Sequence, residues 1–116
     1  MTAARTVLLF SYGSLQNKGV QLDNFGRELR GRADALPGYA RSLVPIDDPA
    51  VIAATGESHY ANLRASSQPR DEVVGTVFEI SEQELAAADQ YEEVAKYQRI
   101  SVTLKSGDRA WVYLRA

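Results

Sequence analysis

The 116-residue chain has no cysteine and a single histidine, His59. Without cysteine the chain has no disulfide, no thiolate nucleophile and no cysteine-based metal site. One histidine cannot form a histidine-rich metal site or a histidine pair. We expect His59 to be a surface or loop histidine rather than a catalytic base, and we expect no metal.

The sequence also lacks an excess of one charge and any long apolar run. Its net charge of −2 gives no attraction to nucleic acid or to anionic membranes. No apolar stretch approaches the roughly 20 residues that span a bilayer, and the N-terminal stretch does not resemble a signal peptide. We therefore expect a cytoplasmic monomer or weak homodimer with no nucleic-acid or membrane partner. The length suits a single domain, residues 1–116.

The first half of the chain has a mixed pattern. Residues 7–10 are all apolar, which is typical of a strand buried on both faces. Residues 16–30 have nearly helical apolar spacings, interrupted by Gly26, and predict a weak helix. Residues 31–44 contain a turn or bulge at Pro37-Gly38. Residues 45–72 hold three of the four prolines and predict a long irregular loop, often functional or mobile.

The second half has a clearer pattern. Residues 72–80 predict a strand, and residues 81–93 predict a helix that opens with a capping box between Ser81 and Glu84. Residues 97–104 and 109–116 alternate between apolar and polar side chains on either side of a turn, which predicts a hairpin. This order of elements indicates a mixed α+β domain.

The first strand ends in Tyr12-Gly13-Ser14-Leu15. Glycine lets the backbone approach a ligand closely, and successive free amides at such a turn can bind an anion, more so if a helix starts near Gln16. The alternative is that Gly13 and Ser14 simply end the strand.

Glu92 is a candidate proton-transfer group. At helical spacing it shares a face with Leu85 and Ala88, which should point to the core. Its place at the end of the helix and its partial burial both disfavour the negative charge. We expect these effects to raise the pKa of Glu92 toward neutrality, as a general acid/base requires.

A structural role for Glu92 is the alternative: a last-turn glutamate paired with Arg99 or Lys96. Its neighbour Glu93 should point to solvent, and Asp89 can serve the helix end or the structure.

Together these stretches resemble the γ-glutamylcyclotransferase superfamily, and more narrowly its short AIG2-like and γ-glutamylamine-cyclotransferase-like members. The resemblance covers most of the chain and depends on the order of its motifs. Those motifs are FSYGSL at 10–15, LPGYARSL at 36–43, GTVFEI at 75–80, ADQYE at 88–92, YQRISVTL at 97–104 and AWVYL at 110–114.

The resemblance implies a small mixed-sheet β-barrel with flanking helices and a cavity at one end. It implies that Glu92 is the catalytic glutamate and that amides of the first turn hold the α-carboxylate of a γ-glutamyl substrate. The implied substrate-binding residues are Tyr12, Gly13, Ser14, Leu15 and Tyr97.

The implied reaction is an intramolecular aminolysis of a small γ-glutamyl amide. The α-amine of the substrate attacks its own γ-carbonyl, which closes 5-oxoproline and releases an amine or amino acid. A carboxylate of raised pKa can remove the amine's proton and later protonate the leaving nitrogen. Because the nucleophile belongs to the substrate, no enzyme nucleophile and no cofactor are needed.

Two other functions stay open from sequence: a non-catalytic protein that binds a small carboxylate in the same cavity, and an interaction domain that uses the fold alone. Retention of Glu92 favours the enzyme.

Tyr60, Asn62 and Arg64 are weaker candidates for contacts to the leaving group, against the alternative of an ordinary surface loop. The remaining arginines considered are expected on a solvated surface: Arg27, Arg30, Arg32 and Arg41.

Overall fold

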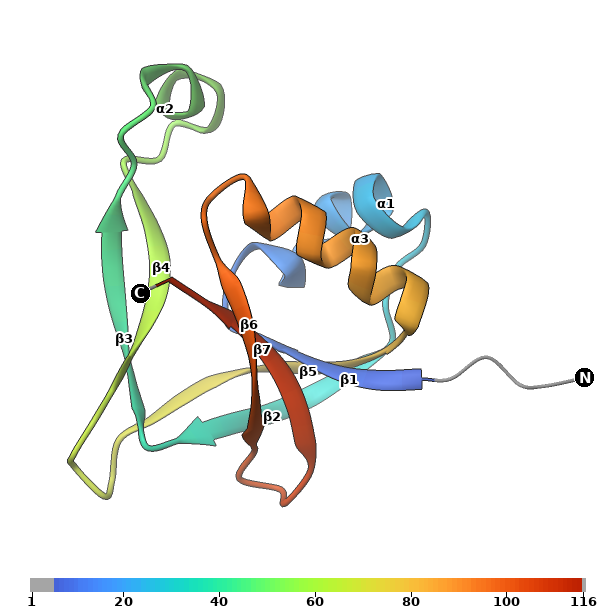
Figure 1. The fold of residues 1–116 in the computed structure, drawn as a ribbon, viewed down its shortest axis with the longest axis vertical. Helices are drawn as coiled ribbons and strands as arrows, with labels where there is room; N and C mark the ends of the chain where they lie inside the picture. The colour runs from blue at the N-terminus through green and yellow to red at the C-terminus, as the bar shows by residue number, and fades with distance from the viewer. Residues whose placement is uncertain (1–5, 116) are drawn as a thin grey trace, which may run out of the picture.

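The computed structural model describes residues 6–115, with Thr55 described by its backbone alone. Figure 1 shows a sheet with helices packed on it and a long arm that stands apart. In chain order the elements are β1 (Thr6–Ser11), the 3-10 turn η1 (Ser14–Gln16), α1 (Lys18–Phe25), β2 (Gly31–Pro37), β3 (Tyr39–Pro45), α2 (Pro49–Thr55), β4 (His59–Ala65), β5 (Glu72–Ser81), α3 (Glu82–Glu93), β6 (Gln98–Thr103) and β7 (Arg109–Leu114).

The main sheet has five strands in the order β2-β5-β1-β7-β6. β1 lies at its centre, antiparallel to β5 and parallel to β7, so the sheet is mixed. β6 and β7 form the predicted hairpin. The predicted α+β class is therefore confirmed, and the predicted helix and strands of the second half are found within a residue or two of their expected bounds.

The predicted barrel is wrong, because the sheet does not close. Its outer strands are β2 and β6. β2 contacts the turn that follows β6, where the Lys105 N–H donates to the Ala35 carbonyl at 2.8 Å and Asp34 accepts from Ser106, without forming a ladder with β6. The chain leaves the sheet at Gly38, whose φ of 81° suits glycine. β3 then pairs with β4 instead of extending the sheet.

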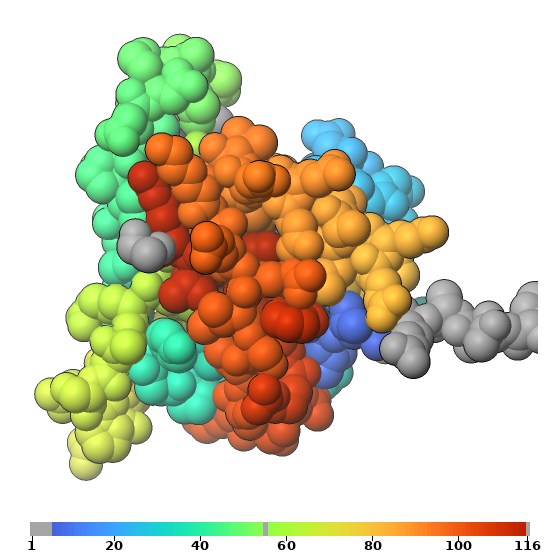
Figure 2. Space-filling model, viewed as in Figure 1, coloured from blue at the N-terminus to red at the C-terminus, as the bar shows by residue number. Residues whose placement is uncertain are grey.

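The predicted irregular loop at residues 45–72 is also wrong for most of its length. It contains α2 and β4, which with β3 form the arm (residues 39–65). Asp48 caps α2 by accepting from the Ala50 N–H at 2.9 Å, Pro49 begins the helix and Gly56 ends it in the left-handed conformation. Figures 1 and 2 show α2 at the tip of the arm, projecting beyond the rest of the molecule.

The core lies on both faces of the main sheet, as the apolar run at 7–10 predicts. Leu9 packs on the helix side with Ile80, Leu85 and Ala88. Phe10 faces the other side, and its neighbours there include Leu36, Val77 and Val112. The central strand is thus fixed between two apolar layers, and the turn that follows it is held in place.

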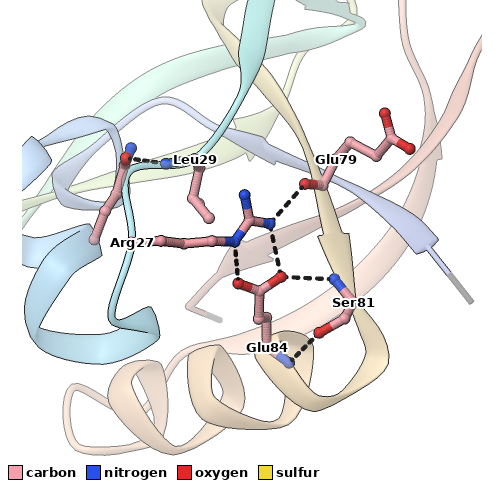
Figure 3. A network of polar contacts seen from close by, with 6 residues as sticks. Arg27, Leu29, Glu79, Ser81 and Glu84 are labelled. Atoms are coloured by element: carbon pink, nitrogen blue, oxygen red, sulfur yellow. Dashed lines mark hydrogen bonds and ion pairs between the residues drawn. The ribbon is translucent and has the colours of Figure 1, made fainter. Parts of the chain in front are cut away.

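The predicted capping box is present at the start of α3. Ser81 accepts from the Glu84 N–H at 3.1 Å, and Glu84 accepts from the Ser81 N–H at 2.9 Å. Figure 3 shows that the same carboxylate also receives a two-pronged contact from Arg27, at 2.7 and 2.8 Å. Arg27 is exposed, as expected, and it also connects the segment after α1 to α3.

Candidate functional site

A cleft of about 560 Å³ lies between the body of the domain and the arm. Its volume suits a small-molecule ligand. Arg41, Glu57 and Tyr60 line it from the arm, and the end of β1, η1 and the last turn of α3 line it from the body. The structure brings together every predicted site residue along this cleft: Tyr12, Gly13, Ser14, Leu15, Glu92 and Tyr97. Their roles in binding and catalysis stay predictions.

The turn at residues 12–15 presents free backbone donors. β5 passes so close to the end of β1 that a Cβ on Gly75 would lie 2.3 Å from the Ser11 carbonyl oxygen, which explains the glycine there. Beyond this contact, the N–H groups of Ser14 and Leu15 find no acceptor within residues 6–115. Neighbouring unpaired amides in a turn can bind an anion.

A Schellman motif at the end of α3 sets the place of Glu92 and Tyr97. The Tyr97 N–H donates to the Glu92 carbonyl at 3.1 Å, and the Lys96 N–H donates to the Glu93 carbonyl at 2.8 Å. Lys96 has a φ of 65°, the left-handed conformation that usually belongs to glycine at this position. The motif reverses the chain so that Tyr97 returns to the same cleft as Glu92.

Burial raises the pKa of Glu92 from its usual 4.5 to about 7, as predicted. The alternative of a structural ion pair with Arg99 or Lys96 is wrong. Arg99 instead contacts Asp89, with 2.8 Å between Nε and Oδ1, and Glu92 has no ion pair within residues 6–115. Glu93 is exposed, as predicted.

Protonated tyrosines line the same cleft as Glu92. Burial raises the pKa of Tyr97 to about 12, with a further contribution from the charge of Glu92. Burial likewise raises the pKa of Tyr12 and of Tyr113. Tyr12 donates its hydroxyl proton to the Tyr113 carbonyl at 2.6 Å, and Tyr97 donates to the carbonyl of Ala61 in the arm. Both predicted tyrosines therefore hold the walls of the cleft through their hydroxyls.

Sequence reasoning missed several residues of this cleft, and three of them bear on its polar contacts and charge: Tyr91, Tyr113 and Arg41. The Tyr91 hydroxyl shares a hydrogen bond of 2.8 Å with Ser14 Oγ, and Tyr113 donates to Asp89 Oδ1 at 2.6 Å. Arg41, expected on a solvated surface, is exposed but lines the cleft. The position of Tyr91 next to Glu92 in the sequence could have indicated that it lies in the cleft. The alternation of side chains along the last strand could have indicated the same for Tyr113. No pattern in the sequence around Arg41 indicates that it lies in the cleft.

Of the three weaker candidates for contacts to the leaving group, only Tyr60 lines the cleft. Tyr60 lines the cleft and packs edge-on against Tyr97, with 6.2 Å between ring centres. Asn62 instead pairs with the backbone of Arg115, at 2.7 and 2.9 Å, and Arg64 is exposed outside the cleft. His59 is exposed, as predicted.

Neither a metal cluster nor a membrane-spanning helix occurs in the described part of the chain. Residues 6–115 contain no group of three or more His, Cys, Asp or Glu side chains placed to hold a metal ion. None of the helices there combines the length and apolarity needed to cross a membrane.

The open mixed sheet, the arm and the cleft define a small α+β domain with a site of small-molecule size. A family model described as gamma-glutamyl cyclotransferase, AIG2-like, matches residues 9–116, so the chain belongs to this family and the resemblance is confirmed. No curated protein matches the chain.

Solved structures agree on the fold. An uncharacterized protein from Homo sapiens is 21% identical with a TM-score of 0.69, and the match covers 96% of this chain and 67% of that one. An AIG2-like protein from Mus musculus is 22% identical, with a TM-score of 0.66 and coverage of 97% and 78%. A gamma-glutamyl cyclotransferase specific to glutathione, from yeast, is 15% identical, with a TM-score of 0.61 and coverage of 97% and 69%. The chain spans about two thirds of the length of the human and yeast proteins.

Proposed function

We propose that this chain is a γ-glutamyl cyclotransferase-type enzyme, which converts a small γ-glutamyl amide into 5-oxoproline and a free amine or amino acid. The observation that carries the proposal is the state of Glu92. It is a cleft-lining carboxyl with no ion pair in the described residues and a pKa of about 7. Such a group can exchange protons in both directions near neutral pH. Membership of the family supports the same conclusion.

In this mechanism the turn after β1 orients the substrate. The unpaired amides of Ser14 and Leu15 hold the α-carboxylate of the glutamyl unit. Holding that end brings the α-nitrogen toward Glu92, which lines the same cleft, and toward the substrate's own γ-carbonyl. Fixing the two reacting groups in this way replaces a search among the conformers of a flexible chain with a single attack geometry.

Glu92 then moves protons between the two nitrogens. Its carboxylate takes a proton from the substrate α-ammonium, which frees the lone pair that forms the new carbon–nitrogen bond at the γ-carbonyl. A proton delivered to the leaving nitrogen allows the old carbon–nitrogen bond to break. In total two protons leave the attacking nitrogen and two reach the leaving nitrogen, so Glu92 ends in its starting state.

The tyrosines that line the cleft do not compete with Glu92 for the proton. Because the pKa of Tyr97 is about 12, its hydroxyl stays protonated throughout the reaction. No cation neutralises Glu92 within the described residues, so the carboxylate remains basic enough to accept a proton.

The test is release of 5-oxoproline from a panel of γ-glutamyl amines, γ-glutamyl dipeptides and glutathione. We expect wild type to act on at least one class and Glu92→Gln to lose about 10²–10⁴-fold in kcat. Glu93→Gln, which removes an exposed charge from the neighbouring residue, is the matched control and should keep wild-type activity.

Absence of product across the whole panel would reject the enzyme. If 5-oxoproline or glutamate still raised the melting temperature in that case, a protein that binds small carboxylates in the same cleft would be the better description.

A further inference from the structure

We infer that Arg41 makes this site selective for substrates whose leaving group carries a carboxylate beside the scissile nitrogen, that is, for γ-glutamyl α-amino acids over γ-glutamyl amines. The inference rests on the proposed function and concerns the part of the substrate that differs between these classes.

Arg41 belongs to the arm's wall of the cleft. It lies on β3 and lines the cleft. The charge of Arg41 lowers the pKa of Tyr12 while the charge of Glu92 raises it, against a larger upward effect of burial. In the β3–β4 ladder Arg41 lies opposite Leu63, two residues along β4 from Ala61, whose carbonyl accepts from the Tyr97 hydroxyl, so Arg41 belongs to the stretch of the arm that meets the Tyr97 wall of the cleft.

The guanidinium of Arg41 is not neutralised by the protein. Three arginines of the body have carboxylate partners, in the pairs Arg27–Glu84, Arg32–Asp108 and Arg99–Asp89. Arg41 has no ion pair within residues 6–115. Glu57 also lines the cleft from the arm, but its charge acts on Tyr91, at the Ser14 side. A cation facing a small-molecule cleft without a partner is available to bind an anion.

In the proposed mechanism the glutamyl α-carboxylate of the substrate already has a binding partner. A second carboxylate, on the leaving group, would need a partner of its own. The glutamyl α-carboxylate goes to the amides of Ser14 and Leu15. In a γ-glutamyl α-amino acid the second carboxylate is bonded to the α-carbon of the leaving amino acid, which is itself bonded to the scissile nitrogen. It therefore lies close to the scissile nitrogen, inside the cleft that both Glu92 and Arg41 line. A leaving amine with no carboxylate, or with one at the far end of a long chain, leaves Arg41 unmatched.

The planar fork of arginine suits a carboxylate. A hydrogen bond to a charged group at such a site is worth a factor of about 10 to 100 in relative rate. Much of this difference should appear as selectivity between substrates rather than as a change in the chemistry, because Arg41 does not move a proton.

The experiment compares two substrates that differ only in this carboxylate, γ-glutamyl-alanine and γ-glutamyl-ethylamine. The measured quantity is the ratio of their kcat/KM values, from 5-oxoproline release. We expect wild type to favour γ-glutamyl-alanine by about 10- to 100-fold. In Arg41→Gln that ratio should fall toward one, and in Arg41→Lys, which keeps the charge without the fork, it should lie between the two.

Arg64→Gln is the matched control, because Arg64 lies on β4 of the same arm, is exposed and does not line the cleft. It should keep the wild-type ratio. A wild-type ratio at or below one would overturn the inference. So would an Arg41→Gln protein that slows both substrates equally, since Arg41 would then hold the glutamyl carboxylate they share. Release of no 5-oxoproline from either substrate or from the wider panel would reject the proposed function itself, a different result from turnover without selectivity.

Discussion

The Tyr97 N–H donates to the carbonyl oxygen of Glu92 at 3.1 Å, so one helix-ending motif fixes two neighbouring residues of the cleft. The backbone of Glu92 is held by the same bond that returns Tyr97 to the cleft wall. Tyr97 in turn donates its hydroxyl to Ala61 of the arm. The end of α3 thus links Glu92, the candidate proton-transfer group, to the arm, which also carries Arg41.

Replacing Lys96 by glycine should stabilise the protein. Lys96 has a φ of 65° in the Schellman motif, a conformation that costs a side-chain-bearing residue roughly 1 kcal/mol relative to glycine. We expect Lys96→Gly to raise the melting temperature by a few degrees. The control is Gln90→Gly, at an exposed position inside α3, which should lower it because glycine costs about 1 kcal/mol in a helix. A lower melting temperature for both variants would show that the left-handed residue is not strained.

Ionisation of Glu92 should make the protein less stable as the pH rises. Its pKa is about 7 in the folded protein and 4.5 when unperturbed, so between these values the folded state binds more protons than the unfolded state. The free energy of unfolding should therefore fall from about pH 4.5 to pH 7, by up to roughly 3 kcal/mol. Relative to wild type, Glu92→Gln should gain stability at pH 8 and lose this advantage below pH 5.

Urea unfolding of wild type, Glu92→Gln and Glu93→Gln at pH 5 and pH 8 measures this difference. Glu93 is exposed, so its variant should follow wild type at both values. A Glu92→Gln protein whose stability relative to wild type is the same at both values would contradict the raised pKa.

Much of the site follows from local patterns in the sequence. The apolar run at residues 7–10 places a buried strand before the turn, and helical phase from Leu85 and Ala88 brings Glu92 toward the interior. The capping box at Ser81 fixes where that phase begins. These are short-range signals, and the structure agrees with them.

The arm could not be predicted from such signals. α2 is only seven residues long, and β4 pairs only with β3 in the described structure, so neither has a long periodic pattern. Whether the sheet closes depends on where the chain leaves β2, at Gly38, and on the long-range approach of β2 to the turn before β7. The placement of Arg41 in the cleft depends on that geometry and on no feature of its neighbours in sequence.

The rate of the proposed reaction should depend on the ionisation of Glu92. The mechanism needs its carboxylate form in the free enzyme, so kcat/KM should rise about tenfold per pH unit below pH 7 and level off above it. The measurement is 5-oxoproline release from the best substrate of the panel between pH 5 and pH 9. Glu93→Gln should show the same profile. A rising limb near pH 4.5 would mean that Glu92 has an ordinary pKa or is not the group that titrates.

Removal of the Tyr97 hydroxyl should loosen the arm. Tyr97→Phe leaves the Ala61 carbonyl of β4 without this donor, at a cost of about 1 kcal/mol, and keeps the ring that packs on Tyr60. We expect faster amide hydrogen exchange in β4 and a higher KM for substrate, since the arm forms one wall of the cleft. Tyr39→Phe is the matched control, because Tyr39 lies on β3 of the same arm and its hydroxyl has no hydrogen bond within residues 6–115. Equal exchange rates in the two variants would mean that the Tyr97 hydroxyl does not hold the arm, and that the other contacts, such as Asn62 with the backbone of Arg115, are sufficient.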